Sequence, residues 1–258
     1  MDHQIGFGLT STYQSDSHIC EPMILGKLQG SAILPPWLSA RRPTEGPEIQ
    51  MVLEFLTRGF PSCQNGETLT IFIEPQIESR YPDIVAVYWR PALTRAWPIE
   101  RLILDYHDFR WLQRIRTTER QELIEGEDFK PKLADVRRLD RLNKAGLLDR
   151  DNNKWMSKSL SEVYATTRIL AVEAKMSFTE EGLDQAFRNT WFSDETYLLV
   201  SKSRMSSIRQ QQAKDSGVTV IHPDDQIVRQ TNASVPHSYV SWLFNDWAWR
   251  ATVDTNLH

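Results

Sequence analysis

Three ionisable side chains stand at the ends of two apolar segments of the chain. Asp83 follows Pro82 and opens the run Ile84–Trp89, while Glu173 and Lys175 lie two residues apart at the end of a later apolar run. Side chains at i and i+2 share one face of a strand, so Asp83 would join Glu173 and Lys175 if the two strands are neighbours. Carboxylates suit Mg²⁺, which prefers oxygen ligands and keeps several waters, and an ammonium beside them would face the attacking water. This set of residues is typical of metal-dependent phosphodiester hydrolysis.

The acid-x-Lys spacing alone is weak evidence, because a chain with nine lysines and 34 acids contains such a triplet about once by chance. A second triplet, 128–130, lies in a polar stretch with no apolar strand around it, so we interpret it as the chance match. A triplet on a strand is also most often part of a solvated, salt-bridging surface. The informative pattern is the combination of Pro82-Asp83 before one apolar strand with Glu173-Ala174-Lys175 at the end of another.

The segments around these residues alternate between strand and helix patterns. Apolar residues at helical spacing behind Pro47 predict a first helix over 48–56, whereas the proline-rich residues 1–47 predict an irregular segment packed across a domain. Alternating helices with strands indicates an α/β fold. The predicted strands are 69–77, 83–89, 168–175, 197–201 and 218–221, and the predicted later helices are 179–190 and 205–215.

With Pro82-Asp83, Glu173-Ala174-Lys175 and this order of strands, the chain resembles the PD-(D/E)XK nuclease superfamily, which has the restriction-endonuclease-like fold. The resemblance covers roughly residues 47–90 and 165–222. It implies that Asp83, Glu173 and the backbone carbonyl of Ala174 hold Mg²⁺ or Mn²⁺. It also implies that Lys175 orients or activates the attacking water and stabilises the charge that develops at phosphorus. Because 90 positions separate Asp83 from Glu173, their strands can pair only if the ends of the intervening stretch meet.

The same resemblance suggests further site residues. Members often place a glutamate on the helix before the sheet, and on a helical wheel Glu48 falls beside Phe55 whereas Glu54 falls away from the apolar face. Glu48 is therefore the better candidate. Some members also carry a glutamine on the helix after the lysine strand, a position that Gln185 has here. Glu74 could contribute a further carboxylate or could simply end its strand.

Residues 103–160 interrupt the alternation with a pattern of their own. Amphipathic helices are predicted over 108–115, 119–124 and 131–145, and a hairpin over 147–156. Three helices followed by a hairpin is the order of a winged helix-turn-helix. We therefore expect a nuclease-like α/β core, a mixed sheet flanked by helices, formed by residues 1–102 and 161–258, with a winged-helix-like α+β module inserted at 103–160.

The third helix of this insertion is basic along one face. Three of its basic residues recur at i, i+4 and i+7, as in a helix that lies in the major groove and contacts DNA phosphates. A second basic stretch, 202–214, could follow phosphates beside the catalytic edge of the sheet. Winged helices also serve as protein-docking modules, so this alternative stays open. The candidates for nucleic-acid contact are Arg137, Arg138, Arg141, Lys144, Lys202 and Arg204.

The composition restricts the possible function classes. With 258 residues and a formal net charge of −4, the chain is too acidic to coat nucleic acid over its whole surface. It has two cysteines without metal-ligand spacing, so neither a disulfide scaffold nor a structural zinc site is indicated. The N-terminus lacks a signal-peptide pattern and no apolar run approaches ~20 residues, so we expect a cytoplasmic protein without a membrane span.

Together, these patterns predict a Mg²⁺-dependent DNA endonuclease, and we hypothesise that it acts with other proteins in a defence or mobile-element system. RNA cleavage would use the same metal chemistry and cannot be separated from DNA cleavage by sequence. The competing interpretation is a non-catalytic winged-helix DNA-binding or adaptor protein whose sheet is only a scaffold. Paired cuts in a duplex would require two active sites and hence a dimer, although the sequence identifies no interface.

Overall fold

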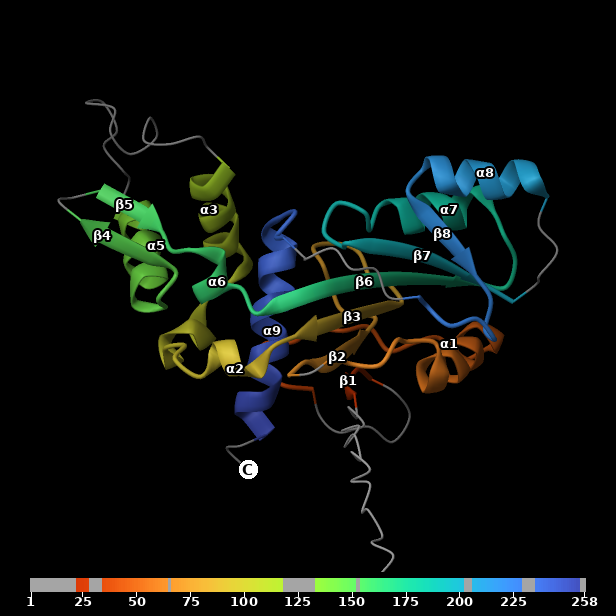
Figure 1. Ribbon diagram of the computed structural model, residues 1–258, viewed down its shortest axis with the longest axis horizontal. Coiled ribbons are helices and arrows are strands. Elements are labelled where there is room, and N and C mark those ends of the chain that lie inside the picture. Colours follow the sequence, from red (N-terminus) through yellow and green to blue (C-terminus); the bar gives the residue numbers. More distant parts are fainter. Residues whose placement is uncertain are drawn as a thin grey trace, which may run out of the picture.

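A computed structural model describes residues 22–27, 34–64, 66–117, 133–151, 154–201, 206–228 and 235–255 (Figure 1). Its centre is a mixed six-stranded sheet in the order β1-β2-β3-β6-β7-β8. The strands are β1 (Met23–Leu25), β2 (Thr68–Ile73), β3 (Ile84–Trp89), β6 (Thr166–Lys175), β7 (Glu195–Val200) and β8 (Val218–Ile221). β3 is antiparallel to both β2 and β6, whereas the other pairs are parallel. Helices flank this sheet, so the α/β fold class with a mixed sheet is confirmed.

The strands next to Asp83 and Glu173 are neighbours in the sheet. β3 pairs with β6 from Ile84 opposite Val172 to Trp89 opposite Thr166. Just beyond this pair, the backbone N–H of Arg90 donates to the carbonyl of Ala165 at 3.0 Å. The two ends of the long intervening stretch therefore meet. This allows the strands that follow Asp83 and carry Glu173 to pair although 90 positions separate the two residues.

One face of the sheet is covered by α1 (Pro47–Arg58). The helix begins at Pro47, because proline fits the first helical turn, where its missing N–H has no partner to lose. Its apolar stripe of Met51, Val52 and Phe55 is buried against strand residues on this face, Ile84 among them. This packing fixes the start of α1 over the end of β6.

The opposite face is covered by α7 (Glu180–Phe187), α8 (Ser207–Asp215) and α9 (Tyr239–Thr255). Every residue from Val240 to Ala251 is buried, because α9 lies between the sheet and the elements of the intervening stretch (Figure 1). Trp242 and Trp249 are both buried on this helix, as their i, i+7 spacing predicts.

The intervening stretch forms a lobe beside the sheet, and its buried apolar side chains belong to the same core as α9 and one face of the sheet (Figure 1). The first and last of its three predicted helices are present. The middle one, predicted over 119–124, lies outside the described residues. Gly146 ends α5 (Leu133–Lys144) with a φ of 71°, and the N–H of Leu147 donates back to the carbonyl of Leu142 at 2.9 Å, as in a glycine-terminated helix. The elements are α2 (Pro91–Thr94), the 3-10 helix η1 (Ile99–Ile103), α3 (Tyr106–Thr117), α5 (Leu133–Lys144), the hairpin strands β4 (Leu148–Asp151) and β5 (Lys154–Ser157), and α6 (Leu160–Val163).

Buried polar contacts join this lobe to α9. The side chains of Arg101 and Asp246 are fully buried and form a two-pronged ion pair, with nitrogen–oxygen distances of 2.7 and 3.0 Å. Arg250 donates to the backbone carbonyls of Arg101 and Leu104 at 2.9 and 2.8 Å. Because buried charges are costly to separate, these contacts fix the lobe against the sheet domain.

Two strand predictions need correction. β2 ends at Ile73 rather than at Ile77, because Glu74 has a φ of 47° and turns the backbone out of the extended conformation. Pro75 then has no N–H to continue the ladder. β1, in the segment predicted to be irregular, was not expected, because three residues are too few for an alternation to be recognised.

Cys63 is disulfide-bonded, and the other cysteine of the chain, Cys20, lies outside the described residues. None of the helices in the described ranges has both the length and the apolar character needed to cross a bilayer.

Candidate active site

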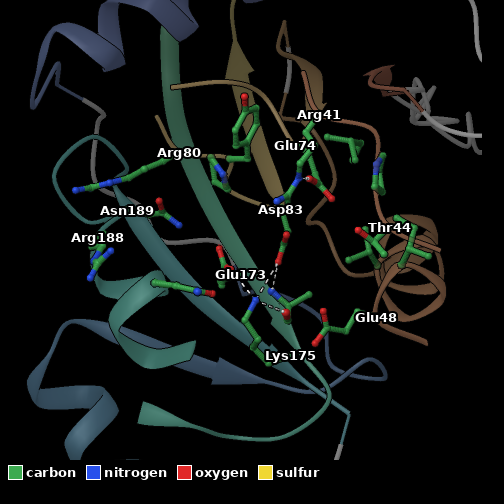
Figure 2. A pocket seen from close by; sticks show the side chains of 18 of the residues that line it. Arg41, Thr44, Glu48, Glu74, Arg80, Asp83, Glu173, Lys175, Arg188 and Asn189 are labelled. Carbon is green, nitrogen blue, oxygen red and sulfur yellow. Dashed lines mark hydrogen bonds and ion pairs between the residues drawn. The ribbon is translucent and has the colours of Figure 1, made fainter. Parts of the chain in front are cut away.

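A pocket of about 450 Å³ opens at the end of the sheet where β3 begins and β6 ends (Figure 2). The start of α1 and the preceding segment form one side of it, with Thr44 and Glu48. The end of α7 and the residues after it form the other side, with Arg188 and Asn189. The predicted catalytic residues lie between these two sides.

Asp83, Glu173 and Lys175 converge in this pocket, as their spacing predicts for neighbouring strands. Nζ of Lys175 donates to Oε1 of Glu173 at 2.8 Å and to the carbonyl of Ala174 at 2.9 Å, and it lies 3.8 Å from Oδ2 of Asp83. The backbone N–H of Ala174 donates to that same Oδ2 at 2.7 Å. The two strands thus hold both carboxylates and the ammonium within direct reach of one another.

Burial makes both carboxylates poor at holding a charge. Removal from water raises the pKa of Asp83 from 3.8 to about 6, although the nearby Lys175 ammonium opposes this shift. Burial, and then repulsion by Asp83, raise the pKa of Glu173 from 4.5 to about 7. A second cation beside the pair would relieve this unfavourable charge.

Lys175 stays charged in this setting. Burial acts to lower the pKa of its ammonium, but attraction by Glu173 and Asp83 outweighs burial and raises it above the ordinary value. A lysine with a raised pKa does not act as a base near neutral pH. It can instead orient a water molecule or stabilise a developing negative charge.

The oxygens at this site suit a divalent metal ion. The Glu173 carboxylate and the Ala174 carbonyl both contact the Lys175 ammonium, with the Asp83 carboxylate close by. Three hard oxygen donors therefore already surround one positive charge, and Mg²⁺ needs few protein ligands because it keeps several waters. Among the described residues, no three His, Cys, Asp or Glu side chains group as a metal-holding cluster, so a metal here would depend on the backbone carbonyl and on water.

Both further candidates also line the pocket. Glu48, in the first turn of α1, accepts from the backbone N–H of Met176, directly after Lys175, at 3.4 Å. Glu48 therefore lies near the lysine. Gln185 lines the pocket from α7, and its amide donates to Glu181 at 3.3 Å rather than to any of the central residues.

The pocket also contains residues that the sequence did not single out. Arg41 forms an ion pair with Glu74, whose N–H donates to the carbonyl of Asp83 at 3.0 Å, so this pair borders the central carboxylates. Arg80 and Arg188 lie on the side of α7 (Figure 2). These arginines come from loops and from a helix end, where no periodic pattern marks a residue as functional.

The basic face of α5 is smaller than its sequence suggests. Arg141 pairs with the fully buried carboxylate of Asp108 at 2.5 Å, and Arg138 lies 3.5 Å from Asp135. Arg141 therefore stabilises the packing of α5 on α3, which corrects its assignment to an outward face. Arg137 and Lys144 remain exposed. Lys202 and Arg204 lie outside the described residues.

Comparison of the chain with protein-family models, with curated proteins and with solved structures gave no match. The geometry of the pocket is therefore the basis for interpreting its function.

Proposed function

We propose that this protein is a Mg²⁺- or Mn²⁺-dependent DNA endonuclease, with a restriction-endonuclease-like core and a winged-helix-like insertion. The observation that carries the proposal is the convergence of Asp83, Glu173 and Lys175 in one open pocket although 90 positions separate the two carboxylates. A sheet that served only as a scaffold would gain nothing from two largely buried carboxylates with raised pKa values, because burying them destabilises the fold.

Each residue has a role in this proposal. Asp83, Glu173 and the Ala174 carbonyl would hold the metal ion. The ion, when bound, polarises the scissile phosphate and lowers the pKa of a bound water. Lys175 orients the attacking water and stabilises the extra negative charge at phosphorus, consistent with its raised pKa. Glu48 and Gln185 flank this centre from opposite helices.

DNA is the proposed substrate, and Arg137 and Lys144 on α5 remain candidates for contacts to its phosphates. A setting with other proteins in a defence or mobile-element system, and a dimer for paired cuts, belong to the same proposal.

The competing function, an adaptor whose lobe docks a protein, is favoured by one observation. Ile103 and Met156 in this lobe are more than half exposed, whereas Arg141 is engaged in packing.

The test of the proposed function separates metal binding from cleavage. In Lys175→Met the metal-holding oxygens remain, so Mn²⁺ should still bind by titration calorimetry while cleavage of plasmid DNA falls by about 10³-fold or more. Asp83→Asn should lose both metal binding and cleavage. Glu100→Gln, which changes an exposed acid outside the pocket, serves as the matched control and should retain both. Wild-type cleavage in Lys175→Met would refute the assignment.

A further inference from the structure

Asn189 carries a buried polar group with no partner in the described structure. Its side chain lines the active-site pocket, the residue is 6% exposed, and its amide nitrogen Nδ2 has no hydrogen-bond partner. An unsatisfied buried donor destabilises a fold unless something completes it, and this donor belongs to a residue in the wall of the pocket. Because Nδ2 is closed to water, the amide must turn to meet such a ligand.

Two unpaired arginines lie beside this amide (Figure 2). Arg80 and Arg188 line the same pocket and are exposed, and neither forms an ion pair or a side-chain hydrogen bond with the residues that the structure describes, although Arg80 attracts the Glu78 carboxylate without direct contact. In contrast, the other cations of the pocket are engaged, Arg41 by Glu74 and Lys175 by Glu173. The two free guanidinium groups are thus available to an anion from outside the chain.

The unpaired cations of the pocket lie on one side. Arg80, Arg188 and Asn189 lie on one side of Glu173, whereas Glu48 and the ion pair of Arg41 with Glu74 lie on the other (Figure 2). Guanidinium groups bind phosphate oxygens in a two-pronged geometry, and an amide N–H adds a neutral donor. An anion would be repelled by the acidic side and held by the basic side.

We propose that Arg80, Arg188 and Asn189 form a phosphate subsite. It holds the phosphodiester that neighbours the scissile one on the same nucleic-acid strand. The inference rests on the proposed function and names how that site would hold its substrate. The strand would enter along the α7 side of the pocket. The subsite then fixes the neighbouring phosphate so that the scissile one faces Asp83, Glu173 and Lys175.

Binding can be measured on the uncut complex by working in EDTA, where the proposed metal chemistry is absent. Fluorescence anisotropy with a labelled single-stranded oligonucleotide at several salt concentrations gives the affinity and its salt slope. Arg80→Ala and Arg188→Ala should each weaken binding by about 5–10-fold and reduce the salt slope by about 0.7. A protein that makes one phosphate contact fewer releases fewer counterions when it binds. Arg95→Ala, an exposed arginine outside the pocket, is the matched control and should change neither quantity.

Asn189→Leu tests the amide separately. Leucine has a similar size and no unsatisfied donor, so this variant should melt no lower than wild type while it binds the oligonucleotide more weakly. A purely structural role for Asn189 would instead leave the affinity unchanged.

The outcomes distinguish this inference from the proposed function. Unchanged affinity and salt slope in both arginine variants would overturn the subsite, even if the wild type cleaves DNA. Weakened binding in a protein that cuts nothing would support the subsite and refute the nuclease. If the arginine variants lose affinity only for an oligonucleotide that carries a 5′-phosphate, the subsite binds a terminal phosphate. That result would overturn the assignment to an internal phosphodiester.

Discussion

Asp83 and Glu173 lie across from each other at the ends of adjacent strands, and their burial favours the protonated form of both carboxyl groups. A carboxyl group whose pKa is raised on folding stabilises the fold below its unfolded pKa, and this contribution is lost as the pH rises through the folded pKa. For the metal-free protein, the free energy of unfolding should therefore fall between about pH 4 and pH 7. Metal ions would need the ionised forms, so metal affinity should rise over the same interval.

Asp83→Asn tests this pH dependence at a single residue. The variant cannot ionise at position 83, so without metal it should be more stable than wild type at about pH 8, and this difference should vanish near pH 4. Urea unfolding at the two pH values measures it. Asp224→Asn, at an exposed carboxylate, is the control and should show no such change. An equal effect of Asp83→Asn at both pH values would contradict the raised pKa values.

Added Mg²⁺ completes the test of this residue. It should raise the melting temperature of the wild type but not of Asp83→Asn, because only the wild type has the full set of oxygens. Equal shifts in the two proteins would place the metal elsewhere.

At the scale of elements, a glycine allows α7 to lie close to β6. A Cβ at Gly182 would lie 2.9 Å from Cγ of Lys175 and 3.1 Å from Oγ1 of Thr179, so even a methyl group must displace the stem of the lysine. Gly182 therefore permits the close approach of helix and strand that positions the ammonium.

Gly182→Ala should separate catalytic geometry from stability. Alanine favours a helix over glycine by about 1 kcal/mol, which offsets part of the crowding, so the melting temperature should change little. A displaced Lys175 should nevertheless lower the rate constant of cleavage by about 10–100-fold. Single-turnover kinetics beside thermal unfolding measure the two effects. Full activity in this variant would show that the approach of α7 does not position the lysine.

The strands and the central site were predictable from sequence for one reason. Strand β3 is apolar throughout and β6 is apolar over Ile169–Val172, and the i, i+2 rule fixes the face that Glu173 and Lys175 share. Irregular backbone carries no such signal, so the turn at Glu74 and the positions of Arg41 and Arg80 were not predictable. The pairing of Arg141 with Asp108 was missed because helical spacing shows which side chains share a face, but not which face meets α3.

On the scale of the whole molecule, the lobe of residues 91–163 and the sheet domain share α9. The buried pair of Arg101 with Asp246 fixes η1 to this helix, so a nucleic acid bound by the lobe would be held at a set distance from the pocket.

Charge reversal on α5 tests whether the lobe binds DNA. The double variant Arg137→Glu and Lys144→Glu should weaken duplex binding and reduce the salt slope by about 2, while cleavage at low salt persists. Arg141 is left intact, because its loss would strand the buried charge of Asp108 and cost about 1–3 kcal/mol of stability. Arg95→Glu is the control for a nonspecific charge effect. Unchanged duplex binding combined with the loss of a protein partner would identify the lobe as a docking module.

The most direct test of the nuclease assignment is the rate of Mg²⁺-dependent DNA cleavage by wild type and Glu173→Gln, measured side by side under single-turnover conditions. Glutamine keeps the size of the side chain but removes one of the two carboxylates, so the variant should stay folded and lose about 10³-fold or more in rate. EDTA should abolish cleavage by the wild type. Equal rates for the two proteins, or wild-type cleavage that persists in EDTA, would contradict the assignment of this pocket as a metal-dependent nuclease site.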